Sequence, residues 1–431
     1  MKILKAYKFR LDTTPEQHER LMQLCGTARF VWNKALEICN QKQEAGGKIP
    51  TAYTMTKWLP IWKKDSETEF LSQGNAVTLQ QKLCDLGAAW KRHFDDLSKL
   101  KQGKIKELHF EAPRFKRRND DRDNSIRIMQ FPRYCQINNR RVKLPSKLGW
   151  VKFRKSRQIE GAIKNCTITR RSSHWYISFQ TEQEWPDPIH SSEKAVGLDM
   201  GIARFVTLSN GEQYQPLNAF KKHQLQLAVE QRKLSRKMKF SANWQKQKQR
   251  INRLHSKIAA CRQDFLHKTS TEISKKHARV VIEDLKVSNM SRSAKGTAEK
   301  PGVNVKAKSG LNKSILDQGW YEFRRQLEYK QHWLGGDVVS VKPQYTSQTC
   351  SACGHVHKDN RKSQAGFKCV ACGHAENADI NAAKNILASG HGVLACGAGS
   401  LEPVTKQEPL RNREKVAAWA RRPHGNPPLI S

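Results

Sequence analysis

An apolar strand that ends in a carboxylate constrains the fold of this chain more than any other feature. Residues 195–199 are almost entirely apolar and end in Asp199, and a β-branched segment at 204–208 follows before a Ser-Asn-Gly turn signal. An ionised carboxylate is costly to bury alone, so Asp199 needs a partner, usually a cation. A simple cap of the turn at Gly201 is the other interpretation, and this stretch alone favours neither.

Two later segments favour a metal site. Residues 280–285 form another apolar strand, which ends in the adjacent carboxylates Glu283 and Asp284. Residues 377–387 predict a helix with Asp379 in its first turn. Mg²⁺ prefers oxygen ligands, and a pair of such ions can stabilise the attacking and leaving oxygens of a phosphodiester displacement. Three acids that arrive from separate elements suit such a site, and because side chains alternate along a strand, only one of Glu283 and Asp284 can point into it.

The chain is strongly basic along its whole length. Its 431 residues carry 78 Lys+Arg against 39 Asp+Glu, a formal net charge of +39. A protein this basic usually has a polyanionic partner. No apolar run is long enough to span a bilayer, and the N-terminus lacks the apolar core of a signal peptide, so we expect no membrane partner and a cytoplasmic location.

The N-terminal part of the chain predicts a strand, a helical block and then a series of short strands. Residues 5–11 alternate like an edge strand, and Thr14, Pro15 and Gln17 form a helix start with a capping box. This helix should run to about residue 43, and two more are expected at 53–62 and 77–97. The strands that follow have a spacing that favours a small barrel: 126–131, 136–144, 150–154, 166–170 and 175–181.

A linker at 185–188 separates this part from the strand of Asp199. A long helical pair is predicted between Asp199 and Glu283, and its apolar stripe is typical of core packing. Later segments are expected to form a mobile loop, a helix and a strand, in that order: 291–313, 321–334 and 337–341. The tail after residue 390 consists of Gly, Pro and charged residues and is expected to be disordered.

Four cysteines have the spacing of a structural zinc site. The pattern C-x₂-C-x₁₅-C-x₂-C is formed by Cys350, Cys353, Cys369 and Cys372. Four thiolates give closed tetrahedral coordination, which leaves no open position for catalysis. A redox dithiol pair is the alternative, but both halves repeat one knuckle pattern, each with a Gly that lets the backbone turn. His355 and His374 are expected to be bystanders, and the seven other cysteines free thiols.

Several motifs together resemble the TnpB family, whose members are transposon-encoded RNA-guided nucleases related to type V CRISPR effectors. The motifs are GLDMG at 197–201, IEDL at 282–285, YTSQTCSACG at 345–354, the second cysteine pair, and ADINAAKNI at 378–386. The resemblance extends over residues 2–387, is weak in the helical block and is strong after residue 194. It implies a multidomain α/β protein in which a RuvC-like nuclease domain of the RNase H fold carries an inserted Cys₄ zinc knuckle.

The resemblance also implies how the remaining chain is organised. A wedge-type β-barrel, interrupted by a helical recognition block, precedes the nuclease domain. The implied boundaries are 1–12 and 104–185 for the wedge-like barrel, 13–103 for the helical recognition block, 190–344 and 377–390 for the nuclease domain, 345–376 for the zinc-binding insertion, and 391–431 for a basic tail.

A function and its residues follow from the same resemblance. Asp199, Glu283 and Asp379 match the catalytic acids and would bind two Mg²⁺ ions, with Glu283 favoured over Asp284, while the four cysteines would bind one structural Zn²⁺. The implied activity is cleavage of double-stranded target DNA beside a short flanking motif, directed by a guide RNA from the transposon end. The rivals are a transposase that performs strand transfer, a guide-directed regulator that binds DNA without cleavage and, more weakly, a zinc-finger transcription factor.

The flanking motif would be read by protein side chains of the N-terminal half. Amides, hydroxyls and basic side chains can reach base edges in a DNA groove. Thr78, Gln81 and Lys82 lie three or four residues apart on one predicted helix face, and Tyr53 and Lys57 could flank them. A solvated polar helix face is the alternative interpretation of these five residues.

Overall fold

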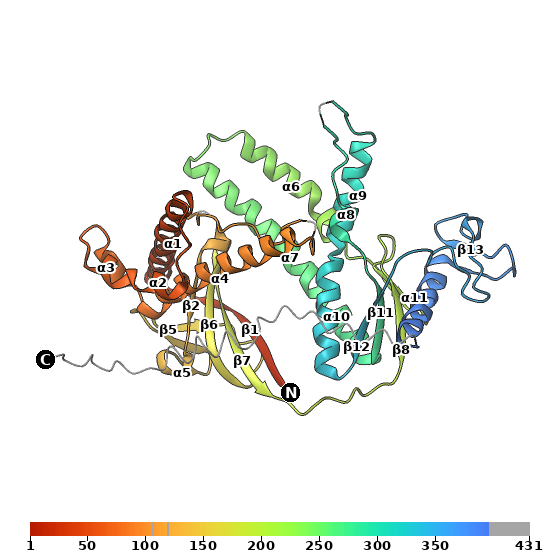
Figure 1. The fold of residues 1–431 in the computed structure, drawn as a ribbon, viewed down its shortest axis with the longest axis horizontal. Helices are drawn as coiled ribbons and strands as arrows, with labels where there is room; N and C mark the ends of the chain where they lie inside the picture. The colour runs from red at the N-terminus through yellow and green to blue at the C-terminus, as the bar shows by residue number, and fades with distance from the viewer. Residues whose placement is uncertain (106, 119, 298, 396–431) are drawn as a thin grey trace. The chain divides into compact units, whose positions relative to one another are not determined.

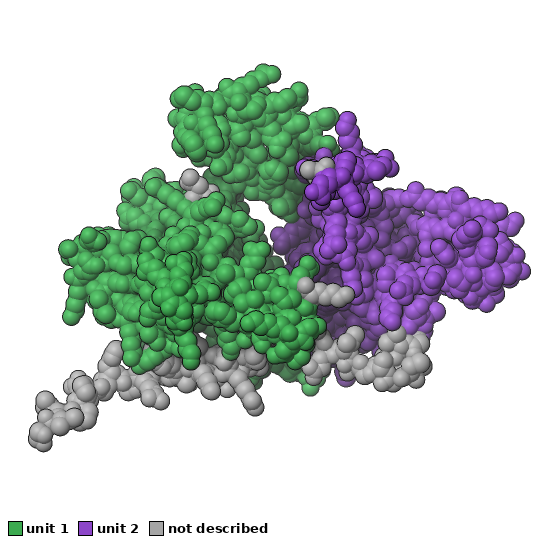
Figure 2. Space-filling view, turned by 45° about the horizontal axis from the view of Figure 1, so that its top comes forward, with its two compact units in different colours: residues 1–187, 223–260 green, residues 188–222, 261–431 purple. Residues whose placement is uncertain are grey.

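The computed structural model (Figure 1) describes residues 1–105, 107–118, 120–297 and 299–395. These residues divide into two units, one of residues 1–187 and 223–260 and one that comprises 188–222 and the chain from Cys261 on (Figure 2). The break at 187–188 lies in the predicted linker. No helix in the described part of the chain is both long enough and apolar enough to cross a membrane.

Unit 1 (residues 1–187 and 223–260) is built on a seven-stranded sheet. Its order is β2-β6-β7-β1-β5-β4-β3, and the paired strands are antiparallel. The strands are β1 (Lys2–Asp12), β2 (Ser125–Ile128), β3 (Gln136–Asn138), β4 (Arg141–Leu144), β5 (Gly149–Phe153), β6 (Ala162–Arg171) and β7 (His174–Glu184). Strand β1 pairs with both β7 and β5, so the predicted edge position of residues 5–11 is wrong. Alternating burial shows that one face of a strand is covered but does not identify its neighbours.

The barrel predicted for this region is not confirmed. The end strands β2 and β3 have no backbone pairing with each other within the described residues, so the hydrogen bonds leave the sheet open. Side chains from strands near both ends still contribute to one core, among them Ile126, Val142, Phe153 and Phe179. A wedge-type barrel therefore stays a prediction for unit 1.

The helices of unit 1 lie between its first two strands or form a separate hairpin. They are α1 (Pro15–Glu44), α2 (Ala52–Thr56), α3 (Trp58–Lys64), α4 (Ala76–Lys101) and residues 223–260 of the hairpin α6 (Ala219–Ser235) and α7 (Ala242–Lys276), with short turns at η1 (Glu69–Gln73), η2 (Asp121–Asp123) and α5 (Phe131–Tyr134). The capping box of α1 is confirmed. Thr14 Oγ1 accepts a hydrogen bond from the Gln17 backbone N–H at 3.3 Å, and Gln17 Oε1 accepts one from the Thr14 N–H at 3.2 Å.

Unit 2 contains a five-stranded mixed sheet in the order β10-β9-β8-β11-β12. Its strands are β8 (Ala195–Asp199), β9 (Val206–Leu208), β10 (Gln213–Tyr214), β11 (Arg279–Glu283) and β12 (Asp337–Val341). Strands β8, β11 and β12 are parallel, whereas β9 is antiparallel to both β8 and β10. In the register of β8 and β11, Leu198 faces Ile282. The next residues, Asp199 and Glu283, therefore lie at the same end of the sheet, where the parallel strands β8 and β11 finish.

The helices of unit 2 differ from the predictions at two places: part of the predicted loop at 291–313 is helical, and the last helix is longer than predicted. They are α8 (Val287–Met290), α9 (Val305–Gln318), α10 (Trp320–Leu334) and α11 (Ala378–Ala395). The loop predicted at 291–313 is wrong in its second half because α9 begins at Val305. Lys308 Nζ donates to the Met290 carbonyl at 2.7 Å, and Asn312 Nδ2 donates to the Ser291 carbonyl at 2.9 Å. These tertiary contacts stabilise the helix although its sequence has only a weak local preference for helix. Helix α11 continues to Ala395, and the predicted disordered tail from 396 on lies outside the described residues.

Helix α11 lies against the sheet at very short range, alongside β8 and β11 (Figure 1). A Cβ at Gly197, in the middle of β8, would overlap the Ala383 carbonyl oxygen and lie 2.7 Å from the Leu387 backbone N. A Cβ at Gly390 is similarly confined, 2.6 Å from Val281 Cγ2. Only glycine at position 197 allows the helix backbone to approach the strand so closely. This approach fixes the first turn of α11, and hence Asp379, relative to the sheet.

We predict that Gly197→Ala destabilises unit 2. The new methyl group meets backbone atoms that cannot rotate away, so α11 must shift, at an expected cost of about 3 kcal/mol or more. Chemical unfolding followed by a unit 2 probe would measure this cost. The control is Gly310→Ala in α9, where a Cβ has nothing within 4 Å and should instead stabilise the helix by about 1 kcal/mol. Equal unfolding midpoints for wild type and Gly197→Ala would contradict the prediction.

Candidate active site and zinc site

The three acids singled out in the sequence come from three elements of unit 2. Asp199 closes β8, Glu283 closes β11 and Asp379 lies in the first turn of α11. Burial, followed by the negative charges of Glu283 and Asp379, raises the pKa of Asp199 to about 7. The carboxylates are therefore close enough to repel one another. Within the described residues, the four cysteines form a group whose ligand atoms all lie within 4.8 Å of one another.

The adjacent carboxylates Glu283 and Asp284 point in different directions. Glu283 is only 8% exposed, and its Oε1 accepts a hydrogen bond from Thr346 Oγ1 at 2.6 Å. Burial raises the pKa of Glu283 despite that hydrogen bond. Asp284 is half exposed and pairs with Arg324 Nη1 at 2.6 Å. The alternation expected along a strand thus places Glu283, and not Asp284, beside Asp199.

Asp379 is held by its own helix end and by one cation. Asn377 Oδ1 accepts hydrogen bonds from the backbone N–H groups of Asp379 and Ile380 at 3.0 and 3.3 Å, which caps the start of α11. Arg361 Nη2 lies 3.3 Å from Asp379 Oδ1. Arg361 also lowers the pKa of Asp199, against the larger effects of burial and the neighbouring acids. It is thus a positive charge facing the acid group.

Arg361 and Thr346 also contact the acids, and neither was predicted from the sequence. Thr346 lies within the motif at 345–354, but nothing in that motif links its hydroxyl to Glu283, which is 63 residues earlier. Arg361 lies between the two cysteine pairs and is one of 78 Lys and Arg residues. Its residue type therefore does not distinguish it as a partner of the acids. Only the folded chain brings these residues to the acids.

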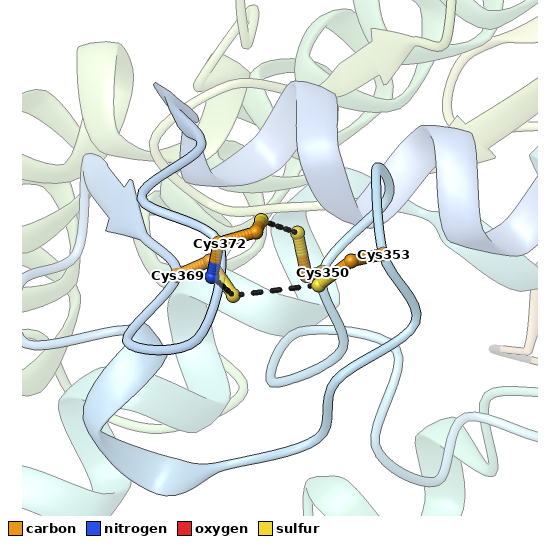
Figure 3. Close-up of side chains that lie close together, drawn as sticks. All are labelled: Cys350, Cys353, Cys369 and Cys372. Atoms are coloured by element: carbon orange, nitrogen blue, oxygen red, sulfur yellow. Dashed lines mark hydrogen bonds between the residues drawn. The ribbon is translucent and has the colours of Figure 1, made fainter.

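The four cysteines of unit 2 form the group that the spacing predicted (Figure 3). The Sγ atoms of Cys350 and Cys372 are 3.7 Å apart, and those of Cys353 and Cys369 are 3.6 Å apart. Tetrahedral zinc with Zn–S bonds of about 2.3 Å requires sulfurs about 3.8 Å apart, so the arrangement fits the ion. Backbone N–H groups of Cys372 and Ala371 lower the pKa of Cys369, whereas hydrogen bonds with neighbouring cysteines raise that of Cys353. Zinc would require all four as thiolates.

The two knuckles have matching backbones. Gly354 and Gly373 both have φ of +76°, a left-handed conformation that favours glycine, and their N–H groups donate to the carbonyls of Cys350 and Cys369. The turning role predicted for these glycines is confirmed. His355 stacks on His357, and neither His355 nor His374 belongs to the metal-binding group.

The cysteine loop is tied directly to α11. Asn381, fully buried, accepts a hydrogen bond from the Ser351 N–H at 2.9 Å and donates to the Thr349 carbonyl at 2.8 Å. Asn385 donates to the carbonyls of Thr346 and Thr349 at 2.9 and 2.6 Å. Two buried amides of α11 therefore hold the first knuckle, so metal binding there should help to order the helix that carries Asp379.

Two of the five residues predicted to read flanking DNA are buried. Thr78 and Lys82 are buried in unit 1, and Lys82 Nζ lies 3.4 Å from Ser125 Oγ, so their assignment to an exposed face is wrong. They lie on the same face of α4 as Leu79, Leu83 and Leu86, which packs into the core. Tyr53 is exposed with Lys57 Nζ 4.6 Å from its ring centroid, and Gln81 donates to Asp85 at 2.9 Å. The DNA-reading hypothesis is thereby reduced to Tyr53, Lys57 and Gln81.

Three family models match separate parts of the chain. A family model described as "Probable transposase" (OrfB_IS605) matches residues 178–294, "Cas12f1-like, TNB domain" matches 320–386, and a "Helix-turn-helix domain" of the OrfB_IS605 type matches 1–48. These matches, the mixed α/β fold and the four-cysteine group define a class: transposon-encoded proteins of the OrfB type that are related to Cas12f1.

Individual relatives narrow the class to a family. The chain is 51% identical to "Putative RNA-guided DNA endonuclease InsQ" of Escherichia coli (strain K12) over 97% of its own length and 100% of the relative. It is 32% identical to "Putative RNA-guided DNA endonuclease" of Streptomyces pristinaespiralis, covering 92% of each chain. It is 29% identical to "CRISPR-associated endodeoxyribonuclease Cas12f1" of Sulfoacidibacillus thermotolerans over 50% of each chain. The chain belongs to the TnpB family, as its motifs predicted.

We predict that zinc binds to the four cysteines and that Cys369→Ser loses it. Elemental analysis of the wild-type protein should find about one zinc per chain, and far less for the variant. Because Zn²⁺ binding contributes folding free energy, unit 2 of the variant should also unfold at lower denaturant. Cys261→Ser, at an exposed free thiol, is the control and should retain both zinc and stability. Wild-type protein purified without zinc would refute the assignment.

We also predict that, in zinc-loaded protein without Mg²⁺, the contribution of Asp199 to stability falls as the pH rises. The pKa of Asp199 is about 7 in the folded chain against an ordinary 3.8, so between these values the folded state holds a proton that the unfolded state has lost. This contribution is full below about pH 4 and is lost as the pH passes about 7.

Asp199→Asn should remove this pH dependence. Its melting temperature should exceed that of the wild type by more at pH 8 than at pH 5, since only at pH 8 is the wild-type carboxylate ionised among its neighbours. Asp284→Asn removes the half-exposed neighbour of Glu283 and is the control. The prediction fails if the two variants show the same pH dependence.

Proposed function

We propose that this chain is an RNA-guided, Mg²⁺-dependent DNA endonuclease encoded by an insertion sequence, which cleaves target DNA beside a short flanking motif. The observation that carries the proposal is the convergence of Asp199, Glu283 and Asp379, in which burial and mutual repulsion raise the pKa of Asp199. Perturbed carboxylates of this kind are typical of catalytic sites. Two relatives that match over nearly the whole chain carry the name of RNA-guided DNA endonuclease, which supports the same function.

The acid group fits Mg²⁺ better than it fits a structural ion-pair network. Its donors are carboxylate oxygens, which Mg²⁺ prefers, and Arg361 is the one cation that the structure describes in a salt bridge with any of the three acids. One positive charge does not balance three negative ones, so the site calls for further cations. When bound, Mg²⁺ would activate the attacking water and stabilise the leaving 3′ oxygen.

The residues of the chain supply position and orientation. Asp199 and Glu283 stand at the end of parallel strands, a rigid edge, and the Thr346 hydroxyl fixes one oxygen of Glu283. Asn377 caps α11 and so fixes the first turn that carries Asp379. Arg361 orients the Asp379 carboxylate and places a positive charge where the DNA phosphate would approach. Such pre-organisation lowers the barrier because charges need not rearrange during the reaction.

The parts of the chain would divide the work as the family resemblance implies. Unit 2, together with residues 223–260 of the hairpin α6 and α7, would be the RuvC-like nuclease domain of RNase H fold, with the zinc insertion at 345–376 and one structural Zn²⁺. The seven-stranded sheet of unit 1 would be the wedge-like part, and its helices within 13–103 the recognition part. A net charge of +39 supports a guide RNA from the transposon end and a double-stranded DNA target as partners. Sequence choice would then come from guide pairing, with Tyr53, Lys57 and Gln81 as candidates to read the flanking motif.

A second candidate function is strand transfer, which the description "Probable transposase" of the matching family model favours. It would use the same acids on a donor DNA end. Incubation with a guide and a circular target that carries no transposon end separates the two functions. The endonuclease linearises or nicks this target, whereas a transposase has nothing to join.

We predict that Asp199→Ala, Glu283→Ala and Asp379→Ala each lower guided cleavage by at least about 100-fold, since each removes a metal ligand. Guided DNA binding should change little, because it depends on base pairing and on contacts outside the acid group. Cleavage of a labelled duplex and a gel-shift assay measure the two properties. Asp284→Ala is the matched control, because Asp284 pairs with Arg324. Normal cleavage by Glu283→Ala together with loss in Asp284→Ala would move the assignment by one residue.

A further inference from the structure

The turn of the hairpin between α6 and α7 exposes apolar side chains that unit 1 does not cover. In this turn Met238 is 79% exposed and Phe240 is 68% exposed. Helices α6 and α7 form an antiparallel hairpin (Figure 1). Just beyond the turn they are joined by a hydrogen bond from Gln247 Nε2 to the Glu230 carbonyl at 3.0 Å. We call residues 236–244 the hairpin tip.

Phe240 is placed at the tip at a conformational cost. Its φ is +70°, in the left-handed region that a bulky side chain rarely occupies. Ser241 Oγ accepts a hydrogen bond from the Trp244 N–H at 3.1 Å and starts α7, and Phe240 contacts Trp244 with ring centroids 5.6 Å apart. That contact still leaves most of Phe240 exposed to solvent. The strain and the exposure together favour a binding role for this ring.

The surroundings of the tip are strongly positive. Residues 223–260 include 10 Lys and Arg but only one acid, Glu230, which already bonds Lys233 at 3.1 Å and Gln247 at 2.6 Å. Lys239 Nζ lies 5.2 Å from the Phe240 ring centroid, and Lys248 Nζ lies 4.9 Å from that of Trp244. Aromatic rings among cations are the combination with which proteins bind unpaired nucleotides: the rings stack on bases and the cations contact phosphates.

We infer that the hairpin tip is a stacking site for an unpaired base of the guide RNA, with Phe240 and Trp244 as the stacking platform and Lys239 and Lys248 as phosphate contacts. The inference rests on the proposed function. Of its two nucleic-acid partners, the target DNA arrives as a duplex and exposes unpaired bases only after the guide has opened it. A guide RNA offers loops and ends before any DNA is bound, and unpaired RNA bases are what proteins stack on aromatic side chains.

RNA binding by Phe240 variants tests this inference. The probe is the RNA that co-purifies with the wild-type protein, sequenced, transcribed in vitro and labelled for filter binding. Phe240→Ala should weaken its binding roughly 5- to 150-fold, the range that loss of one base–aromatic stack produces. Phe240→Trp keeps an aromatic face and should bind like the wild type. Leu225→Ala, at an 83% exposed apolar residue of α6 outside the tip, is the matched control and should have no effect.

Two further variants separate stacking from folding and from charge. Phe240→Gly relieves the positive φ, so its melting temperature should equal or exceed that of the wild type while its RNA affinity falls as in Phe240→Ala. If Phe240 had only a structural role, the Phe240→Gly variant would instead melt at a lower temperature than the wild type. Lys239→Gln should reduce the slope of log affinity against log salt by about 1.

Three results would overturn the inference. One is unchanged RNA affinity in Phe240→Ala, with wild-type binding intact; this leaves the proposed function standing. Another is a loss confined to a 20-nucleotide single-stranded DNA probe, which would assign the tip to a DNA strand. The last is wild-type protein that binds no RNA, which would remove the RNA-guided function and this site together.

Discussion

The close contact between β8 and α11 is the constraint on which the acid site depends. Gly197 has no side chain, and the backbone of α11 at Ala383 and Leu387 occupies the space where a Cβ would lie. Asp199 follows two residues after this contact, and Asp379 lies one turn before Ala383. A strand and a helix that are about 180 residues apart in the chain thus present their carboxylates to the same place. The zinc loop reinforces the arrangement through the buried amides of Asn381 and Asn385.

The convergence of the three acids is electrostatically unfavourable in the protein alone. This unfavourable energy supports the proposal that the site binds a cation. Burial and two neighbouring acids raise the pKa of Asp199, and one arginine only partly compensates. Folding does not select such a group for stability, since a neutral side chain would fit the same strand end more favourably. A bound cation would resolve this conflict, as the proposed function requires.

The sequence predicted those features that depend only on residues a few positions apart. The capping box at Thr14, the strand that ends in Asp199 and the paired cysteine knuckles each depend on residues a few positions apart. The contacts of Arg361 and Thr346 with the acids were not predictable, because they join loops and strands far apart in the sequence. Lys82 was placed with Thr78 and Gln81 on a DNA-reading helix face, yet its long apolar stem allows it to lie in the core face of α4. Register and strand order, including the central position of β1, likewise depend on distant partners.

The central claim is that Asp199, Glu283 and Asp379 act as one divalent-metal site. Crystals of the zinc-loaded protein soaked in Mn²⁺, a stand-in for Mg²⁺ with anomalous scattering, would test it most directly. We expect Mn²⁺ peaks between these three carboxylates, distinct from the zinc peak at the four cysteines, and loss of the Mn²⁺ peaks in Asp199→Asn. A crystal with no Mn²⁺ at saturating concentration, with Arg361 still paired to Asp379, would show that the three acids do not form a metal site.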